Sequence, residues 1–275
     1  MPDKMYLKIL HRALVGEKLD LKNPSTYMQK IQWLKLYDRK PEYTQYADKY
    51  EVRKHIKKTI GEQYLVPLIG VWNSVDEIPF DELPQKFVLK CTHDSGSVII
   101  CKNKEEFDIN LAKSKLSEAL KRNYYTTYRE WVYKDIKPRI VAEEYLQELA
   151  SEDLIDYKVS CFNGKARLIQ VHKNRFGNGI HTTDYFDHEW NRIDMRTRTE
   201  VNSNDVIDKP EHFDEMMELS EKLAKDMLHV RVDWYDAAGK LLFGELTFYE
   251  SAGVDPYGEE AEARLAGWLH LPKTP

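Results

Sequence analysis

The chain has 275 residues, of which 42% are hydrophobic, and a formal net charge of −5 with a pI near 6.0. A chain of this length and composition can bury a sizeable core and form one large domain or a few subdomains. Its acidic balance excludes a broad basic surface for nucleic acid or an anionic membrane, so an anionic ligand would need a local basic site.

The N-terminal stretch MPDKMYLKILHRALVG carries basic residues inside its apolar run. It predicts an amphipathic first helix rather than a signal peptide or a membrane span. The cysteines Cys91, Cys101 and Cys161 are odd in number and form no C-x-x-C pair, which argues against a disulfide framework or a zinc site and favours a reducing compartment. We therefore expect a cytoplasmic protein with no integral membrane segment and no nucleic-acid partner.

Residues 1–84 are predicted to be mainly helical. Thr26 and Gln29 have capping-box spacing at the start of one helical pattern, and Asp48 and Glu51 repeat that spacing before VRKHIKKTIG. The first third of the chain is therefore expected to be helix-rich.

From Phe87 the pattern changes to strands. FVLK and VIIC are two short apolar runs joined by the polar, glycine-containing loop THDSGS. A charged helix over 105–122 and an apolar strand within IVAEEYL, 140–146, follow. This region predicts a small sheet with one helix.

A second hairpin is expected in DYKVSCFNGKARLIQV, residues 156–171, because Asn-Gly is the strongest short-range signal for a type I′ turn. That register would place Lys158 and Arg167 inward on one face. Residues 211–228 have a helical apolar stripe. The fold class is therefore predicted to be α+β.

The stretch RVDWYDAAGKLLFGELTFYE, 231–250, predicts a third hairpin. A type I turn over 236–239, with Gly239 in the left-handed conformation, pairs Asp233 with Phe243 and Arg231 with Glu245. One face is then apolar and carries Val232, Trp234, Leu242 and Leu246. The other face is polar and carries Arg231, Asp233, Glu245 and Thr247.

In that register Asp233 and Glu245 are diagonal neighbours, roughly 7–8 Å apart, and their carboxylates can share a hard cation such as Mg²⁺. The sequence supports a simple ladder equally well. In that ladder Arg231 pairs with Glu245, Asp233 is solvated and no metal is bound. A slip of one residue would also move the acids to opposite faces. The hairpin alone does not choose between these arrangements.

Two other segments bear on the choice. Lys90 ends a strand before THDSGS, an arrangement in which backbone N–H groups and one ammonium close over phosphate oxygens. Taken by itself, this segment fits an ordinary hairpin with a lysine that reaches solvent better than it fits a phosphate-binding loop. In IVAEEYL an apolar strand runs into two adjacent acids. The same pattern is typical of a strand that leads into the start of a solvated helix.

Taken in order, these segments resemble the ATP-grasp superfamily, and most closely its TupA-like (teichuronopeptide biosynthesis-like) branch. The similarity lies in TYMQKIQWLKLYDRKPEYTQYADKYEVRKHI, FVLKCTHDSGS, PRIVAEEYL, DYKVSCFNGK and VRVDWYDAAGKLLFGELTF. It implies an ATP-grasp fold with a helix-rich part at 1–84, a small lid subdomain at 85–148 and a C-terminal subdomain at 149–275, the last two holding ATP between them.

The resemblance also implies roles for individual residues. Lys90 would contact the nucleotide phosphates, Ser95 and Gly96 would lie in the loop that covers them, and Glu143 and the Leu146 backbone would meet the adenine. The remaining implied residues are Asp156 on the ribose, Lys158 in the nucleotide site, Asp233, Glu245 and Thr247 on Mg²⁺, and Arg231 near the transferred phosphate or the acyl intermediate.

The sequence departs from the superfamily at Thr247, where many members have an Asn metal ligand. A hydroxyl coordinates magnesium more weakly than an amide carbonyl does, so the departure bears on the number of metal ions. Glu250, a little further on, is expected to be a surface acid rather than an extra ligand.

The basic stretch VHKNRFGNGIHTTDYFD, residues 171–187, contains further candidates. Lys173 and Arg175 are expected to contact a phosphate or carboxylate of the substrate. His172 and His181 are expected to be solvated loop residues without a role.

The chemistry implied by the resemblance is ADP-forming ligation of a carboxylate to an amine through an acylphosphate, with ATP and Mg²⁺ as cofactors. The family context is bacterial surface polysaccharide, such as capsule or O-antigen, which implies a uronic acid as the carboxylate and an amino acid as the amine. The alternatives are a sugar kinase that uses the same nucleotide site, a glycosyltransferase and a non-catalytic sugar-binding protein. No D-x-D pair is present, which disfavours a metal-dependent glycosyltransferase.

Overall fold

A computed structural model describes residues 1–146, 154–175, 179–237 and 239–273. Contacts between residues divide the chain into two compact units: Met1–Arg39 with Ala150–Pro275, and Lys40–Leu149. The three-part division at 84 and 148 stays a prediction, and its first part is shared between these two units.

The elements follow the order expected for an α+β protein. The helices are α1 Asp3–Leu14, α2 Tyr27–Tyr37, α3 Glu42–Ala47, α4 Val52–Thr59, α5 Ile109–Lys121, α6 Tyr125–Tyr128, α7 Phe213–Leu223 and α8 Glu259–Trp268. The strands are β1 Leu68–Trp72, β2 Phe87–Cys91, β3 Val98–Cys101, β4 Ile140–Glu144, β5 Asp156–Phe162, β6 Lys165–Lys173, β7 Thr182–Asp187, β8 Arg192–Ile193, β9 His229–Ala237 and β10 Lys240–Thr247.

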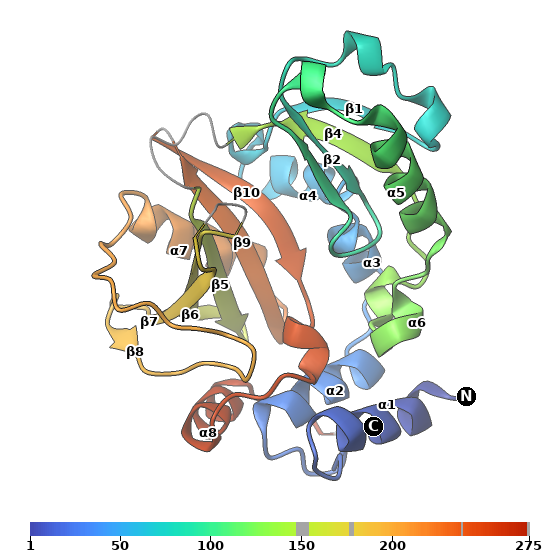
Figure 1. Ribbon diagram of the computed structural model, residues 1–275. Coiled ribbons are helices and arrows are strands. Elements are labelled where there is room, and N and C mark those ends of the chain that lie inside the picture. Colours follow the sequence, from blue (N-terminus) through green and yellow to red (C-terminus); the bar gives the residue numbers. More distant parts are fainter. Residues whose placement is uncertain (147–153, 176–178, 238, 274–275) are drawn as a thin grey trace. The chain divides into compact units, whose positions relative to one another are not determined.

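In the unit of residues 40–149, the described strands form a four-stranded antiparallel sheet in the order β1-β4-β2-β3. Helix α5 packs on this sheet at β2 (Figure 1). The core between them includes Phe87, Leu89, Leu116 and Ala142. Burial of these side chains joins the helix to the sheet.

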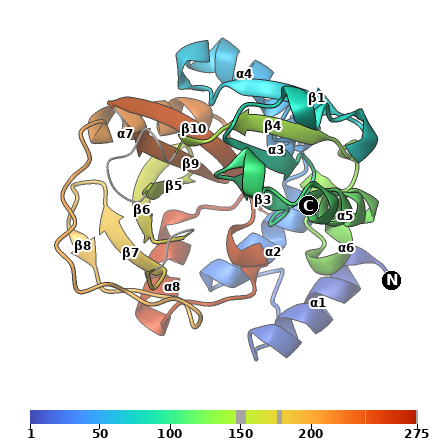
Figure 2. The ribbon, with the colours of Figure 1, turned by 45° about the horizontal axis from the view of Figure 1, so that its top comes forward.

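In the other unit, the described strands form a six-stranded antiparallel sheet in the order β10-β9-β5-β6-β7-β8. Figure 2 shows β5, β6, β7 and β8 following one another across this sheet. Helix α7 packs on one face of the sheet, against β5, β6 and β9. There Trp234 is fully buried and donates a hydrogen bond to Ser220 of α7. The opposite face is therefore the one available for polar groups.

Local signals in the sequence predicted several elements correctly. The Thr26 side chain caps α2 by accepting from the Gln29 amide. Asp48 accepts from the amides of Tyr50 and Glu51 before α4. These caps satisfy amides that a helix start leaves unpaired.

The predicted register of the β9–β10 hairpin is wrong. Asp233 pairs with Glu245, and Arg231 pairs with Thr247, because a bulge lies between Phe243 and Glu245. The extra residue, Gly244, has no Cβ, and an added Cβ would lie 3.1 Å from the Asp233 carbonyl oxygen. Glycine therefore permits the bulge, which brings the two acids directly opposite each other.

The turn and the apolar face of this hairpin also differ from the prediction. Gly239 has the expected positive φ of 71°. Ala237 pairs with Lys240, so strand pairing continues closer to the turn than a type I turn over 236–239 implies. Phe243, and not Leu242, lies opposite Trp234. The apolar face therefore carries Phe243 in place of Leu242.

The β5–β6 hairpin has the predicted turn, with φ of 49° at Asn163 and 78° at Gly164. A register shift between Ser160 and Cys161 leaves Arg167 between two paired residues, Ala166 and Leu168, so the placement of Lys158 and Arg167 on one face stays a prediction. Lys158 lies opposite Gln170.

Candidate active site

A row of polar residues crosses the face of the six-stranded sheet that lies opposite α7. Gln170 of β6 pairs with Lys158 of β5, Lys158 pairs with Asp233 of β9, and Asp233 pairs with Glu245 of β10. Directly opposed residues on antiparallel strands have Cβ atoms roughly 4.5–5.5 Å apart. The sheet therefore places an amide, an ammonium and two carboxylates in one line.

Asp233 is the most heavily bonded member of this row. Arg231 donates from Nε to Oδ1 at 2.7 Å and from an Nη to Oδ2 at 2.8 Å, and Lys158 donates to Oδ2 at 2.5 Å. The Asp233 residue is only 2% exposed. The expectation of a solvated Asp233 is therefore wrong.

The charges around Asp233 compensate for its burial. Burial alone would raise the pKa of Asp233, but Arg231 and Lys158 outweigh this effect and hold the pKa below its ordinary value. Asp233 is thus ionised at neutral pH, and Arg231 is held in a fixed orientation by two hydrogen bonds.

The same network extends along β5. Asp156 lies 2.7 Å from Lys158 Nζ and 2.7 Å from an Nη of Arg175. The other Asp156 oxygen, Oδ1, is buried and has no hydrogen-bond partner among the described residues. Asp156 therefore keeps an acceptor for a further donor.

The two basic residues proposed to contact the substrate differ in their surroundings. Arg175 joins the network through Asp156, whereas Lys173 bonds to Asp205 at 2.9 Å. The segment 182–187, expected to be loop, forms β7 and pairs with β6. The strand orders the residues at this end of the sheet.

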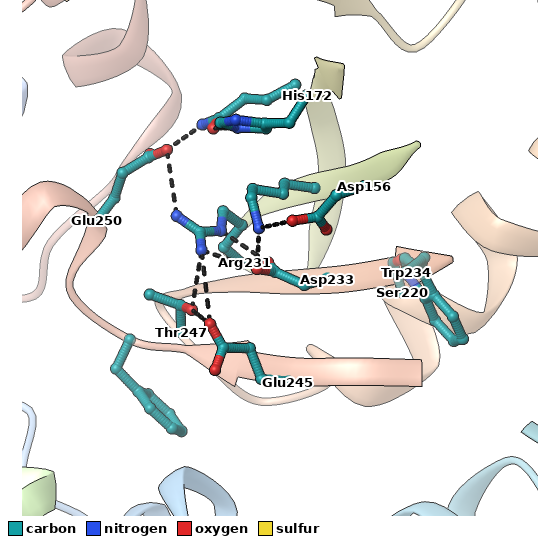
Figure 3. A network of polar contacts seen from close by, with 12 residues as sticks. Asp156, His172, Ser220, Arg231, Asp233, Trp234, Glu245, Thr247 and Glu250 are labelled. Atoms are coloured by element: carbon teal, nitrogen blue, oxygen red, sulfur yellow. Dashed lines mark hydrogen bonds and ion pairs between the residues drawn. The ribbon is translucent and has the colours of Figure 1, made fainter. Parts of the chain in front are cut away.

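Glu245 and Thr247 form the more accessible end of the polar row. The Glu245 side chain is 35% exposed, and Arg231 lies 4.0 Å from its Oε1. Thr247 accepts from Arg231 at 3.1 Å. Figure 3 shows Arg231 with Glu250 on one side and Asp233, Thr247 and Glu245 on the other.

The donor set of Asp233, Glu245 and Thr247 fits a hard divalent cation, since all its atoms are oxygens on one face of two paired strands. Among the described residues, no group of three or more His, Cys, Asp or Glu side chains is placed to hold a metal. Magnesium commonly binds through one or two carboxylates and completes its shell with water and phosphate oxygens, so two acids suffice.

Glu250 is buried, and the expectation of a surface acid is wrong. It is 2% exposed, accepts from the Tyr27 hydroxyl at 2.7 Å, and lies 3.9 Å from an Nη of Arg231. Gln170 donates a short hydrogen bond to its Oε1. Gln170 and His172 alternate within an otherwise apolar run, and this pattern is the sequence signal that points to a polar face of β6.

The turn after Glu250 has an unusual backbone. Ser251, Ala252 and Gly253 all have positive φ values, of 46°, 50° and 62°. From α2, the Gln32 amide donates to the carbonyl oxygens of Ala252 and Gly253, and Lys35 Nζ donates to that of Ala252. These bonds hold a left-handed turn that positions Glu250.

The other unit carries the remaining predicted residues. Lys90 Nζ lies 2.7 Å from Glu143 Oε2, and Arg53 lies 3.5 Å from Glu143 Oε1. Ser95 and Gly96 are exposed, and Gly96 has a φ of 99°.

The two residues predicted to contact the adenine, Glu143 and Leu146, are both buried. Leu146 is 7% exposed and is the last residue described before position 154. The Glu143 carboxylate is engaged by Lys90 and Arg53. The roles of these residues toward a nucleotide stay predictions.

Comparison with known proteins shows what the chain is similar to. A family model described as TupA-like ATPgrasp matches residues 29–267. No curated protein matches the chain. In the part of the chain that the structure describes, no helix has the length and apolarity needed to cross a membrane.

Solved structures with a similar fold include several enzymes named as ligases. The L-amino acid ligase from Bacillus licheniformis has a TM-score of 0.50 and 12% identity, over 92% of this chain and 57% of that one. The D-alanine–D-alanine ligase from Bacillus anthracis complexed with ATP has a TM-score of 0.45 and 18% identity, over 82% and 64%. The D-alanine–D-alanine ligase from Helicobacter pylori has a TM-score of 0.43 and 12% identity, over 82% and 61%. This chain thus spans about three fifths of the length of these enzymes.

Proposed function

Because this chain belongs to the TupA-like ATP-grasp family, we propose that it is an ADP-forming ligase that joins a carboxylate to an amine. The observation that carries the proposal is the polar row of the six-stranded sheet, in which Asp233 and Glu245 face each other beside Arg231. A carboxylate must first be activated, and phosphorylation by ATP makes its carbonyl carbon open to attack by an amine.

The charged groups of the polar row suit a phosphoryl transfer to a carboxylate. The reaction brings an anionic acceptor to an anionic phosphate, so it needs fixed positive charge near the transferred group. Arg231 is held by Asp233 and points one Nη toward Thr247. We assign to Arg231 the stabilisation of charge on the transferred phosphate or the acyl intermediate.

Magnesium would be held by Glu245 and Asp233, with Thr247 as a weaker oxygen donor. When bound, it neutralises negative charge on the nucleotide phosphates. Glu245 is the more exchangeable ligand, because its side chain is 35% exposed while Asp233 is bonded to two cations.

We assign nucleotide contacts to the predicted residues of the unit of residues 40–149. Lys90 would contact phosphate, with Ser95 and Gly96 in the covering loop, and Glu143 and the Leu146 backbone would lie near the adenine. Support for Lys90 comes from its partly exposed ammonium, which can exchange Glu143 for a phosphate oxygen.

In the six-stranded sheet, Asp156 and Lys158 would contact the ribose side of the nucleotide. Asp156 Oδ1, which accepts no hydrogen bond from the described residues, would accept one from a ribose hydroxyl. Arg175 and Lys173 are proposed to contact the substrate anion, with Arg175 better supported because it joins the polar row.

For the substrates, we propose a uronic acid of a bacterial surface polysaccharide as the carboxylate and an amino acid as the amine. The support is the family alone.

The test is to incubate the purified protein with Mg-ATP, a panel of uronic acids and a panel of amino acids, and to follow ADP release and product mass. We expect ADP only when both an acid and an amine are present, with a product mass equal to their amide. ADP with a phosphorylated sugar would instead identify a sugar kinase, and cleavage of a nucleotide sugar would identify a glycosyltransferase.

A further inference from the structure

Two histidines at the end of the polar row form a bonded pair. His172 of β6 lies opposite Asp156 of β5, and its Nδ1 is 3.1 Å from Nε2 of His181. The two rings stack with centroids 5.3 Å apart and planes inclined by 27°. His172 is 9% exposed and His181 is exposed, so the pair leads from the buried network to the surface.

The hydrogen bonds of Glu250 determine the proton positions on His172. A carboxylate only accepts, so the Gln170 group that faces Glu250 must be the NH₂ group. The Gln170 oxygen then faces His172 Nε2 at 3.2 Å. Neutral His172 therefore carries its proton on Nε2 and presents a lone pair at Nδ1.

The lone pair on His172 in turn determines the state of His181. Two nitrogen lone pairs facing each other at 3.1 Å would repel, so His181 carries a proton on Nε2 and donates it to His172 Nδ1. Thr183 contacts the same Nδ1 at 3.2 Å. The acceptor atom of neutral His181 is then Nδ1.

The electrostatic surroundings keep both rings neutral. Burial, then Lys158 and Arg231, lower the pKa of His172 to about 2. Burial and then Arg175 lower the pKa of His181, although Glu200 and Asp156 oppose this and Lys158 adds to it. At neutral pH, His181 is thus unprotonated at Nδ1.

We propose that His181 is the base that accepts a proton from the amine nucleophile, and that Glu250, Gln170 and His172 form a chain that positions it. The proposal rests on the ligase function proposed above. A neutral amine attacks the carbonyl carbon of the acylphosphate, the C–N bond forms, and the C–O bond to phosphate breaks with its electron pair leaving on phosphate. The N–H proton passes to His181 Nδ1, and the imidazolium is stabilised by its bond to His172.

The first test needs no substrate. The side-chain nitrogens of the nine histidines can be observed by ¹⁵N NMR from pH 5 to 9. We expect His172 and His181 in the Nε2–H form at pH 7 to 8, and a Gln170→Leu variant in which His172 populates both forms. A proton on Nδ1 of neutral His172, or a His181 that is charged at pH 7.5, would overturn the proposal.

The second test separates a base from a structural residue. With the acid and amine that support ADP release, we expect His181→Gln to lower kcat by about 10²–10³-fold. His188→Gln, which changes an exposed histidine of the β7–β8 turn, should leave kcat unchanged. Hydroxylamine is strongly nucleophilic and weakly basic, so the N–H of its adduct is acidic enough to lose its proton to water, and it should form the hydroxamate in His181→Gln with a much smaller loss.

The outcomes distinguish the two proposals. Equal losses with the amine and with hydroxylamine in His181→Gln would overturn the base role while the ligase function stands. A wild-type protein that releases no ADP with any pair would overturn the ligase function, and the base role with it.

Discussion

The two sheets neutralise their charges in different ways. In the four-stranded sheet, Lys90 pairs with Glu143, and their side chains are 20% and 10% exposed. In the six-stranded sheet, Lys158 and Asp233 pair with side chains that are 5% and 3% exposed, and each has a further charged partner. One sheet thus carries a partly exposed ion pair, and the other carries a buried network.

This difference indicates what each sheet can exchange with a ligand. The Lys90 side chain is 20% exposed and Glu143 keeps a second partner in Arg53, so an incoming phosphate can replace Glu143 on Lys90. A buried network resists such exchange, because removing one partner leaves an uncompensated charge. Within the network, the exposed carboxylate of Glu245 is the group that accepts a new partner most readily.

The largest expected effect comes from breaking the buried network. Asp233→Ala leaves Lys158 and Arg231 without their shared carboxylate, and we expect a loss of roughly 3–5 kcal/mol in the free energy of unfolding. Urea unfolding measures this loss. Asp205→Ala, which removes an exposed partner of Lys173, is the matched control and should cost much less. Equal losses in the two variants would contradict the distinction between a buried network and an exposed ion pair.

Acid should weaken the unit that contains the buried network. Burial lowers the pKa of His229 to about 4, so between pH 6.5 and pH 4 the unfolded chain binds a proton that the folded chain does not. Stability should therefore fall by roughly 3 kcal/mol as the pH drops through this window.

Urea midpoints measured at several pH values test this, with His229→Gln flattening the dependence and His188→Gln leaving it unchanged. If the stability of His229→Gln falls with decreasing pH as steeply as that of the unchanged protein, groups other than His229 cause the pH dependence.

The turn that positions Glu250 should be sensitive to a single methyl group. Gly253 has a φ of 62°, and an added Cβ would lie 2.7 Å from Gln32 Nε2 and 2.9 Å from Ile31 Cγ2. Gly253→Ala should cost roughly 2–3 kcal/mol by thermal or urea unfolding. Gly267→Ala, within α8 and with nothing within 4 Å of the added Cβ, should instead stabilise by roughly 0.5–1 kcal/mol. A neutral Gly253→Ala would show that the left-handed turn is not held as described.

The smallest effect on stability is expected at Lys90. Lys90→Met breaks a partly exposed pair and should change the free energy of unfolding by less than about 1 kcal/mol. The same variant should weaken Mg-ATP binding by about tenfold or more, which isothermal titration calorimetry measures. Lys102→Met, at an exposed position, serves as the control. Unchanged ATP affinity in Lys90→Met would remove Lys90 from the nucleotide site.

Sequence patterns predicted the features that depend only on residues close together in the sequence. The cap at Thr26, the Asn163-Gly164 turn and the left-handed Gly239 each depend on residues within a few positions. The polar face of β9 and β10 also followed from alternation. These features need no knowledge of distant parts of the chain.

The remaining features depend on contacts that are distant in the sequence. The bulge at Gly244 changed which residue faces Asp233, because glycine tolerates the close approach of the Asp233 backbone. Glu250 is buried because Tyr27, more than two hundred residues away, donates to it. His172 and His181 gain their pairing from the β6–β7 register, which the sequence pattern did not indicate.

The central claim is that this protein activates a carboxylate as an acylphosphate. The most direct measurement uses the acid found in the substrate panel, labelled with ¹⁸O in its carboxylate, together with Mg-ATP and the amine. An acylphosphate requires that one ¹⁸O pass to the released phosphate in each turnover, which mass spectrometry of the phosphate detects. Phosphate without ¹⁸O, with the lost carboxylate oxygen found in AMP or in water instead, would contradict the mechanism.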